Sequence, residues 1–139
     1  MAQGACIPTR QQAVRLAHEW IDAWNRHDLD GIMAHYAEDV MFTSPFVATL
    51  ANEPSGTLQS ATALRAYFSK GLAAYPNLQF ELLDVLTGVT SVTLYYRSVQ
   101  GKLAAEVMKL NGAGLIARVD VHYRDAEVKV PGEECRNVT

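Results

Sequence analysis

Apolar residues in the first part of the chain recur at helical spacing. From Val14 to Trp24 they fall three or four positions apart, which is typical of a helix with one buried face. Thr9 is followed three residues later by Gln12, and this is the pattern of a capping box. A helix is therefore expected to begin just after Thr9.

Two further helices are predicted before the chain changes character. Asp28 can cap a short helix whose apolar stripe ends at Tyr36, and Ser60 can cap a longer one. Between them, Val40–Thr43 is a short strand candidate. Residues 46–59 show no regular period, and a loop of this length in a compact domain is often a lid or a binding loop.

The rest of the chain has the composition and spacing of four strands, rich in Val, Thr, Leu and Tyr. They are expected at Leu78–Leu86, Val92–Val99, Leu103–Leu110 and Leu115–Arg124. Gln100-Gly101 is typical of a two-residue hairpin turn. Helices followed by a meander predict an α+β domain with its helices gathered on one face of the sheet.

The predicted turns fix which side chains share a face of the sheet. They place Tyr95 and Val119 opposite Glu106, and they make Arg97 a diagonal neighbour of Glu106. One face would then carry Tyr95, Arg97, Glu106, Met108, Val119, Val121 and Tyr123. The other would carry Leu94, Tyr96, Leu103, Ala105, Val107, Arg118, Asp120 and His122.

These two faces allow two arrangements. In the first, the helices cover the Glu106 face and leave a pocket, while the other face binds a second subunit. In the second, the helices cover Leu94 and Leu103, and Glu106 and Arg97 lie on the surface. The pattern alone slightly favours the second arrangement, because the part of the sheet around Leu94 and Leu103 is more apolar.

Composition restricts the classes of function. The 139 residues are 49% hydrophobic and 19% charged with a net charge of -3, which indicates one globular domain over residues 10–124 with loose ends at 1–9 and 125–139. The sequence has no run of Lys or Arg, so nucleic acid is not expected as a partner. Cys6 and Cys135 predict neither a zinc site nor a disulfide framework, and no metal or other cofactor is expected. No apolar stretch suggests a signal peptide or a membrane partner, so a cytoplasmic location is expected.

Several short motifs follow one another along residues 10–124. They are EWIDAWNRHDLDGI at 19–32, YAEDV at 36–40, Ser44-Pro45, ALRAYF at 63–68 and the turn at Gly112–Gly114. Together they resemble the SnoaL-like family of the nuclear transport factor 2-like superfamily, whose relatives include ketosteroid isomerase and polyketide cyclases. The resemblance implies a cystatin-like cone, in which three N-terminal helices pack on a strongly curved antiparallel sheet around a pocket. It also implies a homodimer through the outer sheet face, and thus the first arrangement.

The resemblance also assigns roles to residues. Ketosteroid isomerase has an aspartate base before the proline that follows the first strand, and Ser44 stands there in this chain. The tyrosine of the isomerase's oxyanion hole corresponds to Trp20, and its protonated aspartate corresponds to Glu106. Of these three positions, only Glu106 has the same type of functional group, a carboxyl, as the isomerase.

Two functions follow as hypotheses. The first is an isomerase, cyclase or hydratase that binds a small apolar carbonyl compound, with Glu106 as acid/base, Arg97 orienting it, and Tyr95 and Trp20 as donors. The second is a non-catalytic ligand-binding or dimeric interaction module in which Arg97 and Glu106 form a structural ion pair. In either case the predicted pocket wall consists of Trp20, Trp24, Ser44, Tyr67, Phe68, Met108, Val119, Val121 and Tyr123.

Overall fold

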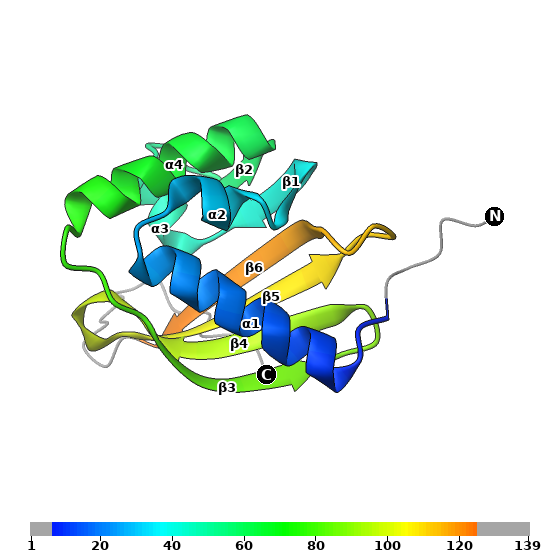
Figure 1. Cartoon of the computed structure of the whole chain (residues 1–139). Helices are drawn as coiled ribbons and strands as arrows, with labels where there is room; N and C mark the ends of the chain where they lie inside the picture. The colour runs from blue at the N-terminus through cyan, green and yellow to red at the C-terminus, as the bar shows by residue number, and fades with distance from the viewer. Residues whose placement is uncertain (1–6, 125–139) are drawn as a thin grey trace, which may run out of the picture.

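The computed structural model of the chain describes residues 7–124 and shows helices packed against a curved six-stranded sheet (Figure 1). The helices are α1 (Arg10–Asn25), α2 (Leu29–Met33), α3 (Pro45–Leu50) and α4 (Ala61–Ala74). The strands are β1 (Tyr36–Thr43), β2 (Thr57–Gln59), β3 (Glu81–Thr87), β4 (Ser91–Arg97), β5 (Leu103–Leu110) and β6 (Ile116–Arg124). Their order in the sheet is β2-β1-β6-β5-β4-β3. The predicted α+β class is confirmed, whereas the predicted loose C-terminal tail lies outside the described residues.

Two of the predicted caps begin the longest helices. At the start of α1, the backbone N–H of Gln12 donates to the hydroxyl of Thr9 at 3.0 Å, and the backbone N–H of Thr9 donates to Oε1 of Gln12 at 2.9 Å. Both bonds of the capping box are therefore present. At the start of α4, the hydroxyl of Ser60 accepts from the backbone N–H of Ala63 at 3.1 Å. These side chains satisfy donors that the first turn of a helix leaves unpaired.

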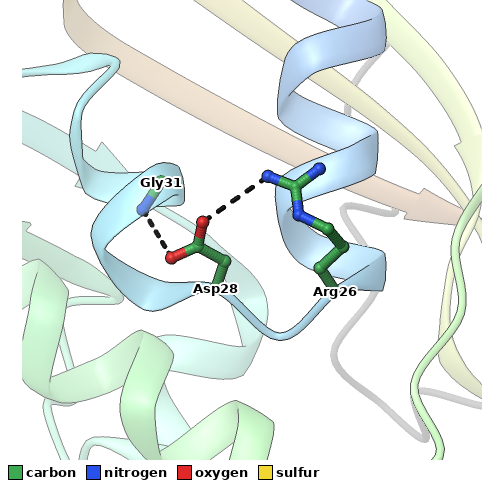
Figure 2. A network of polar contacts seen from close by, with 3 residues as sticks. All are labelled: Arg26, Asp28 and Gly31. Carbon is green, nitrogen blue, oxygen red and sulfur yellow. Dashed lines mark hydrogen bonds and ion pairs between the residues drawn. The ribbon is translucent and has the colours of Figure 1, made fainter.

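Asp28 directs the chain from α1 into α2 (Figure 2). Its Oδ1 accepts from the backbone N–H of Gly31 at 3.0 Å, and its Oδ2 lies 3.5 Å from Nη2 of Arg26. A Cβ atom at position 31 would lie only 2.5 Å from Oδ2 of Asp28. A side chain at position 31 would therefore have to displace the carboxylate of Asp28 from its capping position.

The first half of the sheet differs from prediction in three ways. Tyr36, expected on the second helix, is the first residue of β1. Residues 46–59 are not an irregular loop, because they contain most of α3 and the whole of β2. Ser44 as N-cap and Pro45 in the first turn explain why α3 forms. Finally, β1 pairs with β6 in parallel, so the sheet is antiparallel only in its other pairs.

The turn between β4 and β5 is longer than the predicted two-residue hairpin. It contains a three-residue 3₁₀ turn, η1 (Val99–Gly101), in which Gln100 has φ of 57°. The backbone N–H of Ser98 closes it by donating to the carbonyl of Lys102 at 2.6 Å. The extra residue moves the pairing of the two strands by one position.

This shift changes which side chains of β4 accompany Glu106. Glu106 lies opposite Leu94 instead of Tyr95. Because consecutive strand residues point to opposite faces, the shift places Tyr96 on the inner face with Glu106. The prediction that Tyr95 and Arg97 share the face of Glu106 is therefore wrong.

The pairing of β5 with β6 is also shifted, but with a different consequence. Glu106 lies opposite Val121 instead of Val119, and the register changes between Lys109 and Leu110. A displacement of two residues preserves the face on which each side chain lies. The predicted residues of β6 therefore do share the inner face with Glu106.

Aromatic side chains form the centre of the core, where α1 and α4 meet the inner face of the sheet. Trp24 of α1 packs edge-on against Phe68 of α4, with ring centroids 4.8 Å apart. Trp20 packs edge-on against Tyr96 of β4 at 5.3 Å and stacks on Phe80 at 5.9 Å. Such pairs each add about 1 kcal/mol beyond the area that they bury. They hold the two helices and the sheet in a fixed relation around the site.

Candidate functional site

A partly open cavity of about 70 Å³ lies among α1, α4 and the inner face of the sheet. At ~10–15 Å³ for each water, it has room for roughly five waters. Of the predicted pocket residues, those that line it are Trp20, Trp24, Tyr67, Phe68 and Tyr123. The lining residues that sequence reasoning missed include Phe42, Phe46, Leu78, Phe80, Tyr96 and Ser98. Ser44, Met108, Val119 and Val121 are buried but are not among the described residues that line this space.

Glu106 brings a carboxyl group to this mostly apolar wall. Its side chain is 2% exposed, and its Oε1 accepts a hydrogen bond from the hydroxyl of Tyr96 at 2.6 Å. Burial raises the pKa of Glu106 from 4.5 to about 7, while the bond from Tyr96 acts in the opposite direction. Near neutral pH this carboxyl group can therefore either accept or release a proton.

Four tyrosines lie close enough to Glu106 for its negative charge to raise their pKa values. Burial raises the pKa of Tyr67 to about 12 and raises that of Tyr123 further, and the negative charge of Glu106 adds to both shifts. Burial also places the pKa values of Tyr36 and Tyr96 well above 10.0. All four phenols therefore keep their protons at neutral pH and can act as hydrogen-bond donors.

Trp20 and Ser44, the other two positions to which the sequence resemblance assigned catalytic roles, both contact these tyrosines. Trp20 donates from Nε1 to the hydroxyl of Tyr36 at 2.9 Å. Ser44 caps α3, and hydrogen bonding to its hydroxyl lowers the pKa values of Tyr67 and Tyr123 against the effect of burial. Ser44 is thus a buried neighbour of the tyrosines rather than a group on the cavity surface.

Trp24 adds a polar group that lacks a partner. Its Nε1–H is buried and makes no hydrogen bond within the described part of the chain. A buried donor without an acceptor costs about 1–3 kcal/mol. Because Trp24 also lines the cavity, an oxygen acceptor placed against it would recover part of this cost.

Tyr95 and Arg97 do not take part in this arrangement. Tyr95 is 37% exposed, and Nε of Arg97 lies 3.4 Å from Oε1 of Glu81 instead of pairing with Glu106. The longer β4–β5 turn is the reason for both placements. The structural ion pair between Arg97 and Glu106, proposed as the alternative, is therefore wrong as well.

Comparison with known proteins identifies the family. Residues 17–124 match the family model of the SnoaL-like domain. The chain belongs to the SnoaL-like family. No curated protein matches it significantly.

Solved structures agree with this SnoaL-like assignment. A SnoaL-like protein of unknown function from Burkholderia thailandensis is 38% identical, with a TM-score of 0.83 over 86% of this chain and 100% of that one. A ketosteroid isomerase candidate from Kribbella flavida is 22% identical, with a TM-score of 0.63 over 89% of this chain and 86% of that one. A protein from Methylobium petroleophilum with a cystatin-like fold is 13% identical, with a TM-score of 0.72 over 91% of this chain and 84% of that one. The last two show the fold alone, and the cystatin-like architecture is confirmed.

Metal sites and membrane-spanning helices were also sought among the described residues of the SnoaL-like domain. Within residues 7–124, no group of three or more His, Cys, Asp and Glu side chains is placed to hold a metal ion. Over the same residues, no helix is both long enough and apolar enough to cross a membrane. The polar groups of the residues that line the cavity include the carboxyl group of Glu106, several phenols, the indole N–H of Trp24 and the hydroxyl of Ser98.

Proposed function

We propose that this SnoaL-like chain is an enzyme that moves protons on a small apolar carbonyl compound without a cofactor, as an isomerase, cyclase or hydratase would. The observation that carries the proposal is the carboxyl group of Glu106, buried in an aromatic cavity with a pKa raised to about 7. A catalytic acid/base is most effective when its pKa lies near the working pH. The apolar wall favours a substrate whose reacting part is itself apolar.

The chemistry requires one base, one site for negative charge and one acid. The carboxylate of Glu106 takes a proton from the carbon next to the substrate carbonyl, and the electron pair of that C–H bond moves toward the carbonyl oxygen. The neutral hydroxyls of Tyr67 and Tyr123, which line the cavity, are donors for the resulting enolate oxygen. Glu106 then returns its proton to the same or another carbon of the enolate, which regenerates the carboxylate.

Tyr96 is a positioning residue in this scheme. Its hydroxyl holds Oε1 of Glu106 at 2.6 Å and so fixes the direction of the carboxyl group. The ring of Tyr96 is itself held by Trp20 and Phe80, whose centroids lie 5.3 and 4.9 Å away. A carboxyl group held in this way loses little freedom when it reacts.

A second candidate is a domain that binds the same kind of ligand without converting it. Ser44 favours this reading, because a neutral hydroxyl stands where ketosteroid isomerase has its base. The binding groups would be unchanged, and Glu106 would serve as a hydrogen-bonding partner for the ligand. Only turnover separates the two candidates.

The test uses acetone in D₂O, because a carbonyl compound with four heavy atoms suits a cavity with room for roughly five waters. Exchange of its α-hydrogens for deuterium is followed by proton NMR, and binding is followed by the fluorescence of Trp20 and Trp24. Wild type should accelerate exchange, Glu106→Gln should abolish the acceleration, and Glu38→Gln should retain it, because Glu38 is an exposed carboxyl on β1. Saturable binding without accelerated exchange would support the second candidate and reject the enzyme.

The outer face of the sheet leads to a separate proposal about assembly. We infer that it forms a homodimer interface, since Tyr95, Ala105 and His122 follow one another across β4, β5 and β6 on the side away from the helices. Sedimentation of wild type should show a dimer, and Tyr95→Glu should dissociate it by placing a charge in the contact. A monomeric wild type at the highest concentration tested would reject this interface.

A further inference from the structure

We propose that a groove outside the cavity is a second subsite that binds an acidic end group of the same substrate. This proposal rests on the proposed function, because it assumes that the reacting carbonyl occupies the inner cavity. The groove has a volume of about 480 Å³ and lies among the end of α4, residues 76–79 and the β4–β5 turn. It shares four wall residues with the inner cavity, namely Tyr75, Leu78, Ser98 and Val99. The two spaces are thus adjacent, and Glu106 lines the inner one.

The wall between the two spaces is firmly held by the end of α1. Oδ1 of Asn25 accepts from the backbone N–H of Phe80 at 2.6 Å, and Nδ2 of Asn25 donates to the carbonyl of Phe80 at 3.0 Å. Nε2 of His27 lies 3.1 Å from the carbonyl of Leu78. Because both ends of this short segment are hydrogen-bonded to the end of α1, the boundary between the two spaces has a defined shape. A ligand that spans them need not order the segment itself.

The two spaces differ in polarity. The inner cavity is walled mainly by aromatic side chains, whereas the groove is lined by two charged residues and by the amides Asn77 and Gln79. Ser98, which lines both spaces, is 7% exposed and places a hydroxyl at their junction. The matching ligand is amphipathic, with an apolar carbonyl-bearing part inside and a polar end outside.

Arg97 is the reason for inferring that this polar end group is acidic. Its Nε lies 3.4 Å from Oε1 of Glu81, and its Nη1 donates to the carbonyl of Gly101 at 3.5 Å. The guanidinium is therefore held at the groove from two sides, while its forked donors match a carboxylate. The side chains of Arg97 and Glu81 are 48% and 67% exposed, and an ion pair this exposed contributes little stability. A ligand carboxylate can therefore replace Glu81 beside Arg97 at small cost.

The test measures binding alone, in the Glu106→Gln background, so that turnover does not enter. The probes are methyl ketones that carry alkyl chains of increasing length ending in a carboxylate, with the methyl esters of the same acids as matched neutral ligands. Affinity is read from tryptophan fluorescence at low salt. At the best chain length the acid should bind roughly fivefold more tightly than its ester, the effect expected of one exposed charge pair.

Two further variants separate charge recognition from a structural effect. Arg97→Gln should remove the preference for the acid, whereas Glu81→Gln should increase it, because Glu81 competes for the same guanidinium. Both variants break the same ion pair, so a merely structural role predicts changes in the same direction. Equal affinity for acid and ester, equal effects of the two variants, or a preference for an amine-ended chain would each overturn the subsite.

The outcomes for the subsite and for the proposed function are distinct. If the acid preference depends on Arg97 but wild type never exchanges α-hydrogens, the subsite stands and the enzyme proposal fails. If wild type exchanges the hydrogens of acetone but shows no acid preference, the enzyme stands and the subsite fails.

Discussion

Replacing Glu106 by Gln should change how the stability of the protein depends on pH. The pKa of Glu106 rises from 4.5 to about 7 in the fold, because burial disfavours its charged form. Between these pH values the unfolded chain has released this proton while the folded protein retains it. The free energy of unfolding of the wild type therefore contains a contribution that falls as pH rises through this window and is constant below and above it.

The magnitude follows from the pKa change. Since each tenfold change in an ionisation constant corresponds to about 1.4 kcal/mol, the rise from 4.5 to about 7 amounts to about 3 kcal/mol. Glu106 is buried throughout, so solvent does not screen this effect. Gln has nearly the same shape and can still accept the bond from Tyr96, but it does not ionise. The stability of Glu106→Gln relative to wild type should therefore increase by about 3 kcal/mol from below pH 4.5 to above pH 7.

Urea unfolding followed by tryptophan fluorescence measures this difference, because Trp20 and Trp24 are both buried in the native state. Glu38→Gln controls for the loss of one negative charge from the surface. A difference in stability between Glu106→Gln and wild type that stays flat across the whole window would show that Glu106 ionises normally in the fold. The acid/base role proposed for it would then lose its physical basis.

Two further predictions concern single contacts. Gly31→Ala should be less stable than Gly71→Ala by about 1–2 kcal/mol, because its new Cβ displaces the carboxylate of Asp28 that caps α2, whereas a Cβ at position 71 meets nothing within 4 Å. Both changes gain the same helix propensity, so it cancels in the comparison. Equal stabilities in urea unfolding would contradict the close approach. Tyr96→Phe should raise the pKa of Glu106, because it removes the bond that lowers this pKa, and the pH profile of deuterium exchange should move to higher pH. An unchanged profile would show that Tyr96 does not act through Glu106.

The helices were predictable because their signals are local. The capping box at Thr9 and the caps at Asp28 and Ser60 involve residues three positions apart, and each begins a helix in the structure. The apolar spacing of α1 likewise identified Trp20 and Trp24 as inward-facing. The α+β class followed from the order of the elements.

The site was less predictable, because it depends on one turn. A two-residue and a three-residue turn after β4 are both compatible with Gln100-Gly101, and the choice decides whether Tyr95 or Tyr96 faces Glu106. The alternation of apolar and polar residues along β4 could not decide which tyrosine faces inward, since each face of that strand carries one. The parallel pairing that brings Tyr36 near Glu106 joins distant segments and has no local signal.

The pairing of β1 with β6 also bears on how the protein folds. Phe42 of β1 lies opposite Val119 of β6, and this parallel pairing joins β1 and β2 to the remaining strands. Such a contact closes a long stretch of chain and forms late, after local hairpins and helices. Phe42 and Glu106 both line the cavity, and they reach it from opposite sides of this contact. During synthesis on the ribosome, the meander can form its hairpins as they emerge, but a ligand would find its complete binding site only after the last strand has left the exit tunnel.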